Sequence, residues 1–332
     1  MIPSRLSPQN PRLAPLASLL APQLATVNAC ILEKMQSSAP LIPQIAGYLI
    51  AQGGKRLRPL LTVASAELCG YEGTRHIQLA ACVEFIHTAT LLHDDVVDES
   101  TLRRGTISAN AKWDNKASVL VGDFLFSRAF ELMVADGSLE ILRILSEASS
   151  VIAEGEVMQL SLSHDLTLTE ETYLKIIHAK TAQLFSATTE IGAVLADATT
   201  EERKALAGFG KNLGVAFQLM DDVLDYAADQ EKLGKSIGDD FRERKVTLPV
   251  ILAYQKGADR AFWEEVFQDG IRDKGELAHA IHLLKNSGAL LKTKHTAQDY
   301  VKEAIEYLEI FPDSLLKTAL QDLAYFSLHR ER

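Results

Sequence analysis

Apolar and polar residues repeat along most of this chain with the period of an α-helix. Ala, Leu, Glu, Lys and Gln fill long segments, turn signals are sparse, and no alternating β-branched run is long enough to build a sheet. We therefore expect an all-α fold, built as one large helical bundle. The predicted helices cover 16–36, 40–52, 56–69, 74–98, 115–135, 138–164, 169–196, 199–228, 245–255, 273–290, 293–309 and 313–328.

Two of these helical stretches are apolar on most of their faces. The segments from Phe124 to Val134 and from Thr181 to Leu195 look like central helices of a large bundle. Such helices either fill an ordinary core or line a central apolar cavity, and the pattern leaves both open.

The N-terminal prolines, the apolar stretches and the cysteines of the 332-residue chain indicate which class of protein it belongs to. Scattered prolines at the start break any continuous signal-peptide helix, so we expect a flexible arm at 1–15 and one all-α domain over 16–332. No stretch approaches the roughly 18 apolar residues of a membrane span. Cys30, Cys69 and Cys82 lack a paired spacing, which argues against disulfides or zinc and favours a cytoplasmic protein.

The overall charge is acidic, with 34 Lys and Arg against 44 Asp and Glu, a formal net charge of −10. Nucleic-acid binders usually carry a basic excess, so we expect no nucleic acid partner. An acidic total still permits a local basic site for phosphates.

Six aspartates form two copies of one motif, DDxxD, each at the end of a mostly apolar run: Asp94, Asp95 and Asp98, then Asp221, Asp222 and Asp225. Residues four apart on a helix share a face, so carboxylates stack there and repel one another. Mg²⁺ offsets such repulsion, since it binds one or two carboxylates and completes its shell with water and phosphate oxygens. One such motif is often only a solvated helix end, but two copies favour a polyphosphate held by several Mg²⁺ ions.

Basic residues gather near these motifs in three clusters: Lys55 with Arg58, Arg103 with Arg104, and Lys235 with Arg242, Arg244 and Lys245. Each alone would be ordinary surface charge, but together they suggest an anion site held directly by Arg and Lys. His87 lies seven residues before Asp94 on nearly the same helix face and could donate to a phosphate, although a helical histidine is more often a core residue.

Six segments carry a wider pattern: GGKRLRP at 53–59, VEFIHTATLLHDDVVDESTLRRG at 83–105, VGDFLFSRAF at 121–130, KTAQLF at 180–185, GVAFQLMDDVLD at 214–225 and LGKSIGDDFRERKVTLP at 233–249. In order and spacing they resemble the trans (all-E) isoprenyl diphosphate synthases, from about residue 40 to the end. They look closest to the long-chain branch that makes the octaprenyl or decaprenyl tails of ubiquinone. The resemblance implies an isoprenoid-synthase bundle, a homodimer, and a prenyltransferase that joins isopentenyl diphosphate to an allylic diphosphate such as farnesyl diphosphate.

The resemblance also implies roles for single residues. The isopentenyl diphosphate would be held by Lys55, Arg58, His87 and Arg104. Mg²⁺ on the allylic diphosphate would be held by Asp94, Asp95, Asp98, Asp221, Asp222 and Asp225. The allylic diphosphate itself would meet Arg103, Lys180, Thr181, Gln218, Lys235 and Lys245. Thr181, Gln218 and the Lys180 carbonyl would aim their oxygen dipoles at the developing allylic cation.

Product length in this family is set by an apolar tunnel below the first aspartate motif. A helix descends about 5.4 Å per turn, close to one isoprene unit. Short-chain enzymes place a bulky aromatic residue four or five positions before the first aspartate, where this chain has Thr90 and Ala89. The tunnel is therefore expected to be open there and the product long, with Phe85, Ile86 and Met158 as candidates for its floor or for ordinary core contacts.

One position departs from the family pattern, since Arg244 stands where a glycine usually precedes the lysine. This puts the backbone shape near Lys245 in question. Three other readings stay open: an HD-type phosphohydrolase using His93 and Asp94, a terpene cyclase, and a non-enzymatic partner subunit. The phosphohydrolase would leave the duplicated motif and the basic clusters unexplained. A cyclase shares the aspartate motif but does not need the isopentenyl site of Lys55, Arg58 and Arg104, and a non-enzymatic subunit would be expected to have a broken aspartate motif.

Overall fold

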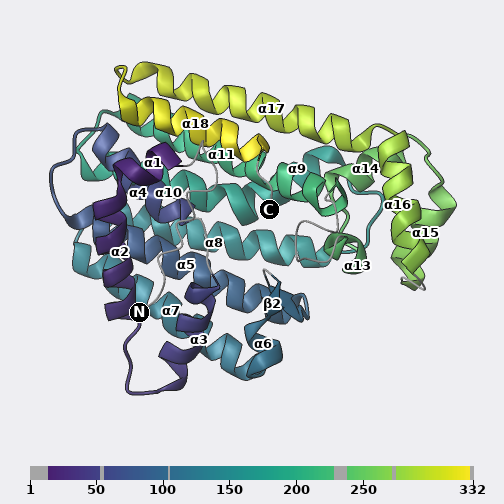
Figure 1. Ribbon diagram of the computed structural model, residues 1–332, viewed down its shortest axis with the longest axis horizontal. Coiled ribbons are helices and arrows are strands. Elements are labelled where there is room, and N and C mark those ends of the chain that lie inside the picture. The colour runs from purple at the N-terminus through teal and green to yellow at the C-terminus, as the bar shows by residue number, and fades with distance from the viewer. Residues whose placement is uncertain (1–13, 53–55, 104, 228–237, 271–273, 330–332) are drawn as a thin grey trace. The chain divides into compact units, whose positions relative to one another are not determined.

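The computed structural model describes residues 14–52, 56–103, 105–227, 238–270 and 274–329 (Figure 1). Most of them are helical, which confirms the all-α prediction. Most of the predicted arm lies outside the described residues, and the first helix already begins at Ala14. None of the described helices combines the length and apolarity that a bilayer crossing demands.

The first part of the chain contains these elements: α1 (Ala14–Leu19), α2 (Ala21–Lys34), α3 (Leu41–Ala51), α4 (Leu57–Leu68), α5 (Arg75–Val97), β1 (Leu102–Arg103), β2 (Thr106–Ile107), α6 (Ala109–Lys112), α7 (Asn115–Asp136) and α8 (Leu139–Ser161). The second part contains α9 (Glu170–Ile177), the π-helix η1 (His178–Ala182), α10 (Gln183–Leu195), α11 (Thr200–Ala227), α13 (Asp239–Arg242), α14 (Leu248–Gln255), α15 (Arg260–Asp269), α16 (Lys274–Asn286), α17 (Ala289–Tyr307), the 3₁₀ turn η2 (Leu308–Ile310) and α18 (Leu315–His329).

Each predicted helix is present, and the segments 16–36 and 169–196 are divided into shorter pieces. The pattern missed the antiparallel hairpin β1–β2 and the helices α6, α13 and α15. Most of these elements are too short to show a helical period. Their conformation therefore depends on contacts with the rest of the fold.

Contacts between Cα atoms divide the chain into two compact units. The first contains Met1–Ser149, Leu184–Gly210 and Tyr307–Leu323, and the second contains Ser150–Gln183, Lys211–Glu306 and Ala324–Arg332. Several long helices, α11 among them, contribute residues to both units. The single domain over 16–332 remains a prediction, which the division into two compact units does not test.

In the first unit, the antiparallel helices α5 and α7 lie side by side along most of their length (Figure 1). Cys82 of α5 donates its thiol to the Ala129 carbonyl, and Ser118 donates its hydroxyl to the Leu92 carbonyl at 3.0 Å. At Gly122 the His93 ring occupies the space that a Cβ atom would need, so this position admits no side chain without a shift. The tight approach buries α5, which carries the first aspartate motif.

The prediction of a central helix from Phe124 to Val134 is wrong. Phe130 and Val134 are 41% and 66% exposed, because only the opposite face of α7 packs on α5. The other segment is confirmed as central, since most of α10 is fully buried. Apolar composition alone did not distinguish a covered helix from one with a free apolar face.

In the second unit, the helix that contains Lys180 and Thr181 is wound as a π-helix over residues 178–182. The Gln183 amide donates to the His178 carbonyl, the five-residue spacing of such a turn. Gly155 of α8 permits this backbone to come close, because an added Cβ atom would lie 2.8 Å from the Ala179 side chain and 2.9 Å from the Lys180 nitrogen. Single π-turns inside α-helices are frequent at functional sites.

Candidate functional site

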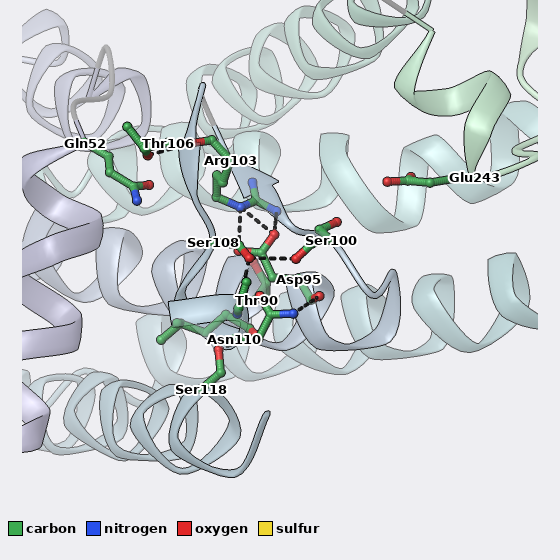
Figure 2. A network of polar contacts seen from close by, with 12 residues as sticks. Gln52, Thr90, Asp95, Ser100, Arg103, Thr106, Ser108, Asn110, Ser118 and Glu243 are labelled. Atoms are coloured by element: carbon green, nitrogen blue, oxygen red, sulfur yellow. Dashed lines mark hydrogen bonds and ion pairs between the residues drawn. The ribbon is translucent and has the colours of Figure 1, made fainter. Parts of the chain in front are cut away.

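The first aspartate motif ends α5, and its middle member is an ion-pair partner of the hairpin that follows. Asp95 is 0% exposed. The Arg103 guanidinium donates from Nε to both carboxylate oxygens at 2.8 Å and approaches Oδ1 with Nη2 at 2.7 Å. Figure 2 shows this fork closing over the Asp95 side chain. Asp94 and Asp98 are only half-buried, so the motif contains two environments.

The return of the chain after α5 holds Arg103 in place. The Ser100 amide and the Asn110 side chain donate to the Asp95 carbonyl at 2.9 and 3.0 Å. Ser108, which also caps α6, donates its hydroxyl to the Ser100 carbonyl at 2.6 Å (Figure 2). These bonds hold Ser108 and Asn110 against the end of α5.

A small cavity of about 20 Å³ lies beside this network in the first unit. Its walls include the side chains of His87, Arg103, Arg56 and Glu84. Arg56 and Glu84 form an ion pair whose side chains are 13% and 8% exposed. Arg56 has a φ of 47°, the left-handed conformation that most residues avoid, so this buried pair also fixes a strained turn.

The remaining predicted isopentenyl diphosphate ligands are only partly described. The Arg58 guanidinium lies over the Phe185 ring, 4.5 Å from its centroid. Lys55 and Arg104 lie outside the described residues. The structure brings His87 together with Arg103, to which the resemblance gives an allylic role, at the same cavity.

The second motif lies near the C-terminal end of α11, where Asp222 is 1% exposed. The Tyr173 hydroxyl donates to Oδ2, and the Gln218 amide donates to Oδ1 at 3.0 Å. Gln218 in turn accepts the Thr181 hydroxyl at 3.0 Å. Burial raises the pKa of Asp222 to about 7, although the two donors act to lower it. The predicted pair Thr181 and Gln218 is thus joined to the aspartate motif by hydrogen bonds.

The last aspartate of this motif is held by the backbone instead. Asp225 is 2% exposed and accepts the amides of Asp239 and Asp240 at 3.3 and 3.0 Å, at the start of α13. Desolvation and the neighbouring Asp225 and Asp222 raise the pKa of Asp240 well above its ordinary value. Asp221 is half-buried, as Asp94 and Asp98 are.

Two predicted cations of the second unit are paired with glutamates. Lys180 contacts Glu156 at 2.6 Å, and Lys245 contacts Glu243 at the same distance. Arg244 has a φ of 52°, so the backbone keeps the left-handed shape that glycine favours despite the substitution. Lys235 lies outside the described residues.

The carboxylates of the two aspartate motifs suit Mg²⁺ that is bound jointly by protein and substrate, and not a metal ion that is enclosed by protein ligands alone. Within the part of the chain that the structure describes, no three His, Cys, Asp or Glu side chains come together as a metal cage. Asp95, Asp222 and Asp225 are instead held by donors of the chain itself. Mg²⁺ commonly uses one or two carboxylates together with phosphate oxygens, and such a site needs its substrate to be complete.

His93 does not support the HD-type reading. Its Nε2 lies 3.2 Å from the Val119 carbonyl and 3.4 Å from Asp123, both on α7. The ring is therefore engaged by the neighbouring helix, beside the close approach of Gly122.

The predicted tunnel residues of α5 occupy different depths. Phe85, Ile86 and Ala89 are fully buried, and the half-buried Thr90 donates its hydroxyl back to the His87 carbonyl at 2.8 Å. Met158 is 39% exposed on a stretch of α8 that also exposes Val157 and Leu160. The tunnel roles remain predictions.

Four residues that contact the predicted site or line its cavity were not predicted from the sequence: Arg56, Glu84, Tyr173 and Glu156. Signals were present for two of them, because Arg56 stands in the basic segment GGKRLRP and Glu84 is a charge inside an apolar helical run one turn before His87. Tyr173 gave none, since a tyrosine in an amphipathic helix is ordinary.

The chain is similar to known proteins over most of its length. A sequence model of the polyprenyl synthetase family matches residues 39–284. The chain is 46% identical over 321 residues to the octaprenyl diphosphate synthase of Escherichia coli K12, covering 95% of this chain and 98% of that protein.

Two solved structures are similar over 96% of this chain and 98% of theirs, each at 51% sequence identity. One is a polyprenyl synthase from Caulobacter crescentus complexed with calcium and isoprenyl diphosphate, with a TM-score of 0.93. The other is a decaprenyl diphosphate synthase from Rhodobacter capsulatus, with a TM-score of 0.91.

Proposed function

The chain belongs to the polyprenyl synthetase family, and on this premise we propose that it is a long-chain trans-polyprenyl diphosphate synthase, a prenyltransferase. It condenses isopentenyl diphosphate head to tail onto an allylic diphosphate primer such as farnesyl diphosphate. The product is an octaprenyl or decaprenyl diphosphate for a ubiquinone side chain. The observation that carries the proposal is the pair of complete aspartate motifs, each held in place by donors of the chain.

The aspartate motifs would hold Mg²⁺, more than one ion per active site. Asp94, Asp98 and Asp221 are the more accessible members and would meet the ions first. Asp95, Asp222 and Asp225 would orient the motifs and add negative charge. When bound, Mg²⁺ acts as a Lewis acid that neutralises the allylic diphosphate and makes it a better leaving group.

The chain's own polar groups serve the carbon chemistry. The carbon–oxygen bond of the allylic diphosphate breaks, the isopentenyl double bond attacks the resulting cation, and a proton leaves to the released diphosphate. Thr181, Gln218 and the Lys180 carbonyl would direct oxygen dipoles toward the cation, and the observed Thr181–Gln218 hydrogen bond supports this set. No protein nucleophile is required.

Binding of the two diphosphates is divided among the basic groups. Lys55, Arg58, His87 and Arg104 would bind isopentenyl diphosphate, and Arg103, Lys180, Lys235 and Lys245 would assist the allylic diphosphate. The shared cavity of His87 and Arg103 supports a role for both near the first motif. The Arg103–Asp95 fork suggests that Arg103 acts mainly by fixing this motif.

The protein is proposed to act as a homodimer in the cytoplasm. Leu120, Phe130 and Val134 form an exposed apolar stripe on α7, as expected of a surface that a second copy covers. The three cysteines are free, which agrees with a reducing compartment.

Product analysis tests the proposal. The protein is incubated with Mg²⁺, farnesyl diphosphate and labelled isopentenyl diphosphate, and the dephosphorylated alcohols are separated by chromatography. A single long polyprenol is expected, and its length decides between octaprenyl and decaprenyl. No label in an elongated alcohol would refute the synthase assignment.

A matched pair of variants tests the tunnel. Ala89→Phe places a bulky ring at a fully buried position of α5 and is expected to shorten the product. Thr90→Ser, which keeps the hydroxyl that bonds the His87 carbonyl, should leave product length unchanged. Equal product lengths for Ala89→Phe and the parent protein would refute an open tunnel at this level.

A further inference from the structure

We propose that Tyr173 is a positioning residue that fixes the Asp222 carboxylate within the second Mg²⁺-binding motif, an inference that rests on the proposed function. The Tyr173 side chain, on α9, is 4% exposed, and its hydroxyl donates to Oδ2 of Asp222 on α11. The two residues lie 49 positions apart in the sequence, so only the packing of these helices joins them.

Asp222 has both of its oxygens engaged by side chains. Gln218 donates to Oδ1 at 3.0 Å, while the Gln218 carbonyl oxygen accepts the Thr181 hydroxyl at 3.0 Å. This second bond orients the amide so that its NH₂ group faces Asp222. A carboxylate with a donor on each oxygen has a defined rotation, and partners of this kind orient metal ligands and tune their affinity.

Asp222 differs from Asp95 of the first motif in the charge of its hydrogen-bond donors. Asp95 is held by a cation, since Arg103 closes on it at 2.7 to 2.8 Å and offsets its negative charge. Tyr173 and Gln218 are neutral donors. They can fix the direction of the Asp222 carboxylate without placing a positive charge beside it that would compete with a metal cation.

The Tyr173 contact can be removed by mutation without changing the contacts that hold Asp225. Asp225 is held by backbone amides, which remain when a side chain is exchanged for that of any residue except proline. The Tyr173 contact depends on one hydroxyl group. Tyr173→Phe deletes that group and leaves the buried ring in place, so packing is largely retained.

The test measures the Mg²⁺ concentration at half-maximal prenyl transfer, together with KM for isopentenyl diphosphate. For Tyr173→Phe, the Mg²⁺ midpoint is expected to rise about tenfold, the lower end of the range for such supporting partners. KM for isopentenyl diphosphate should stay within twofold, because Tyr173 is not among the predicted ligands of that substrate. Tyr254→Phe is the matched control, since it deletes a tyrosine hydroxyl that donates to Glu264 at 2.7 Å in the same unit.

A midpoint within twofold of the parent protein would overturn the proposal. So would a loss of rate at an unchanged midpoint, which indicates a purely structural role. In an Asp222→Asn background the effect of Tyr173→Phe should vanish, and a full effect there would show that Tyr173 does not act through Asp222.

The role of Tyr173 can be tested even if the proposed function is wrong. If the parent protein makes no polyprenol, calorimetric titration of Mg²⁺ in the presence of inorganic diphosphate compares the same variants. Tyr173→Phe should then bind Mg²⁺ about tenfold more weakly than Tyr254→Phe, and equal binding would refute the role of Tyr173.

Discussion

Removal of the Arg103 guanidinium should destabilise the protein strongly, because it leaves the Asp95 carboxylate buried without its cation. Asp95 is 0% exposed and receives three N–H contacts from Arg103 at 2.7 to 2.8 Å. Breaking a fully buried ion pair costs about 3–5 kcal/mol. The Arg103 side chain is 22% exposed, so water reaches part of this pair, and we expect a loss of about 2–3 kcal/mol for Arg103→Met.

Two further variants separate the charge from the fork geometry. Arg103→Lys keeps the charge but offers a point donor in place of the fork, and should lose about half as much stability as Arg103→Met. The double variant Asp95→Asn with Arg103→Met removes the buried charge and should recover at least half of the loss. Arg143→Met is the control, because its pair with Glu147 is more than half exposed on both sides and is worth about 0.5 kcal/mol or less.

The assay is equilibrium unfolding in urea, followed by circular dichroism and by tryptophan fluorescence. Trp113 follows α6 directly, beside the network that holds the hairpin, so fluorescence also detects local opening there. The reasoning is refuted if Arg103→Met loses no more than Arg143→Met, or if the double variant is as unstable as the single one.

Three further predictions follow from other sites. Arg244→Gly should be more stable than Arg244→Ala by about 0.5–1 kcal/mol in urea unfolding. The φ angle is 52° there, and the relief of left-handed strain outweighs the extra entropy of the unfolded glycine chain. Equal stabilities of the two variants would show that the turn is not strained. Burial lowers the pKa of His76, so the unfolded state takes up the proton first, and stability should fall as the pH drops below about 6.5. That acid sensitivity should be smaller in His76→Phe, and an identical pH profile of the melting temperature would contradict it. Leu120→Glu places a charge on the exposed α7 stripe and should yield monomers in analytical ultracentrifugation, whereas an unchanged dimer would place the interface elsewhere.

Local pattern was sufficient for the long helices and for the position of the aspartate motifs. Helical periodicity depends on residues within three or four positions of one another, so it can be read along the chain. It predicted the helix that ends in Asp94 and Asp95 and the helix that carries Asp221 and Asp222.

The surroundings of those aspartates could not be predicted in the same way. The sequence presents two equivalent motifs, yet Asp95 is paired with a cation whereas Asp222 is held by neutral donors. The choice depends on which helix face is buried and on what a distant segment brings to it. Tyr173 reaches Asp222 across 49 positions, and Glu84 reaches Arg56 across 28.

Backbone conformation shows the same division. Nothing in the residues around Lys180 predicts a π-turn, which is accommodated by the close approach of Gly155. The left-handed turn at Arg244 persists without the usual glycine. The sequence by itself determined the helical class, the family and the residue types of the site, since these depend on composition and short-range spacing. Only the tertiary structure decided which carboxylates are buried and what orients them, because burial and hydrogen bonding are set by contacts between segments far apart in the chain.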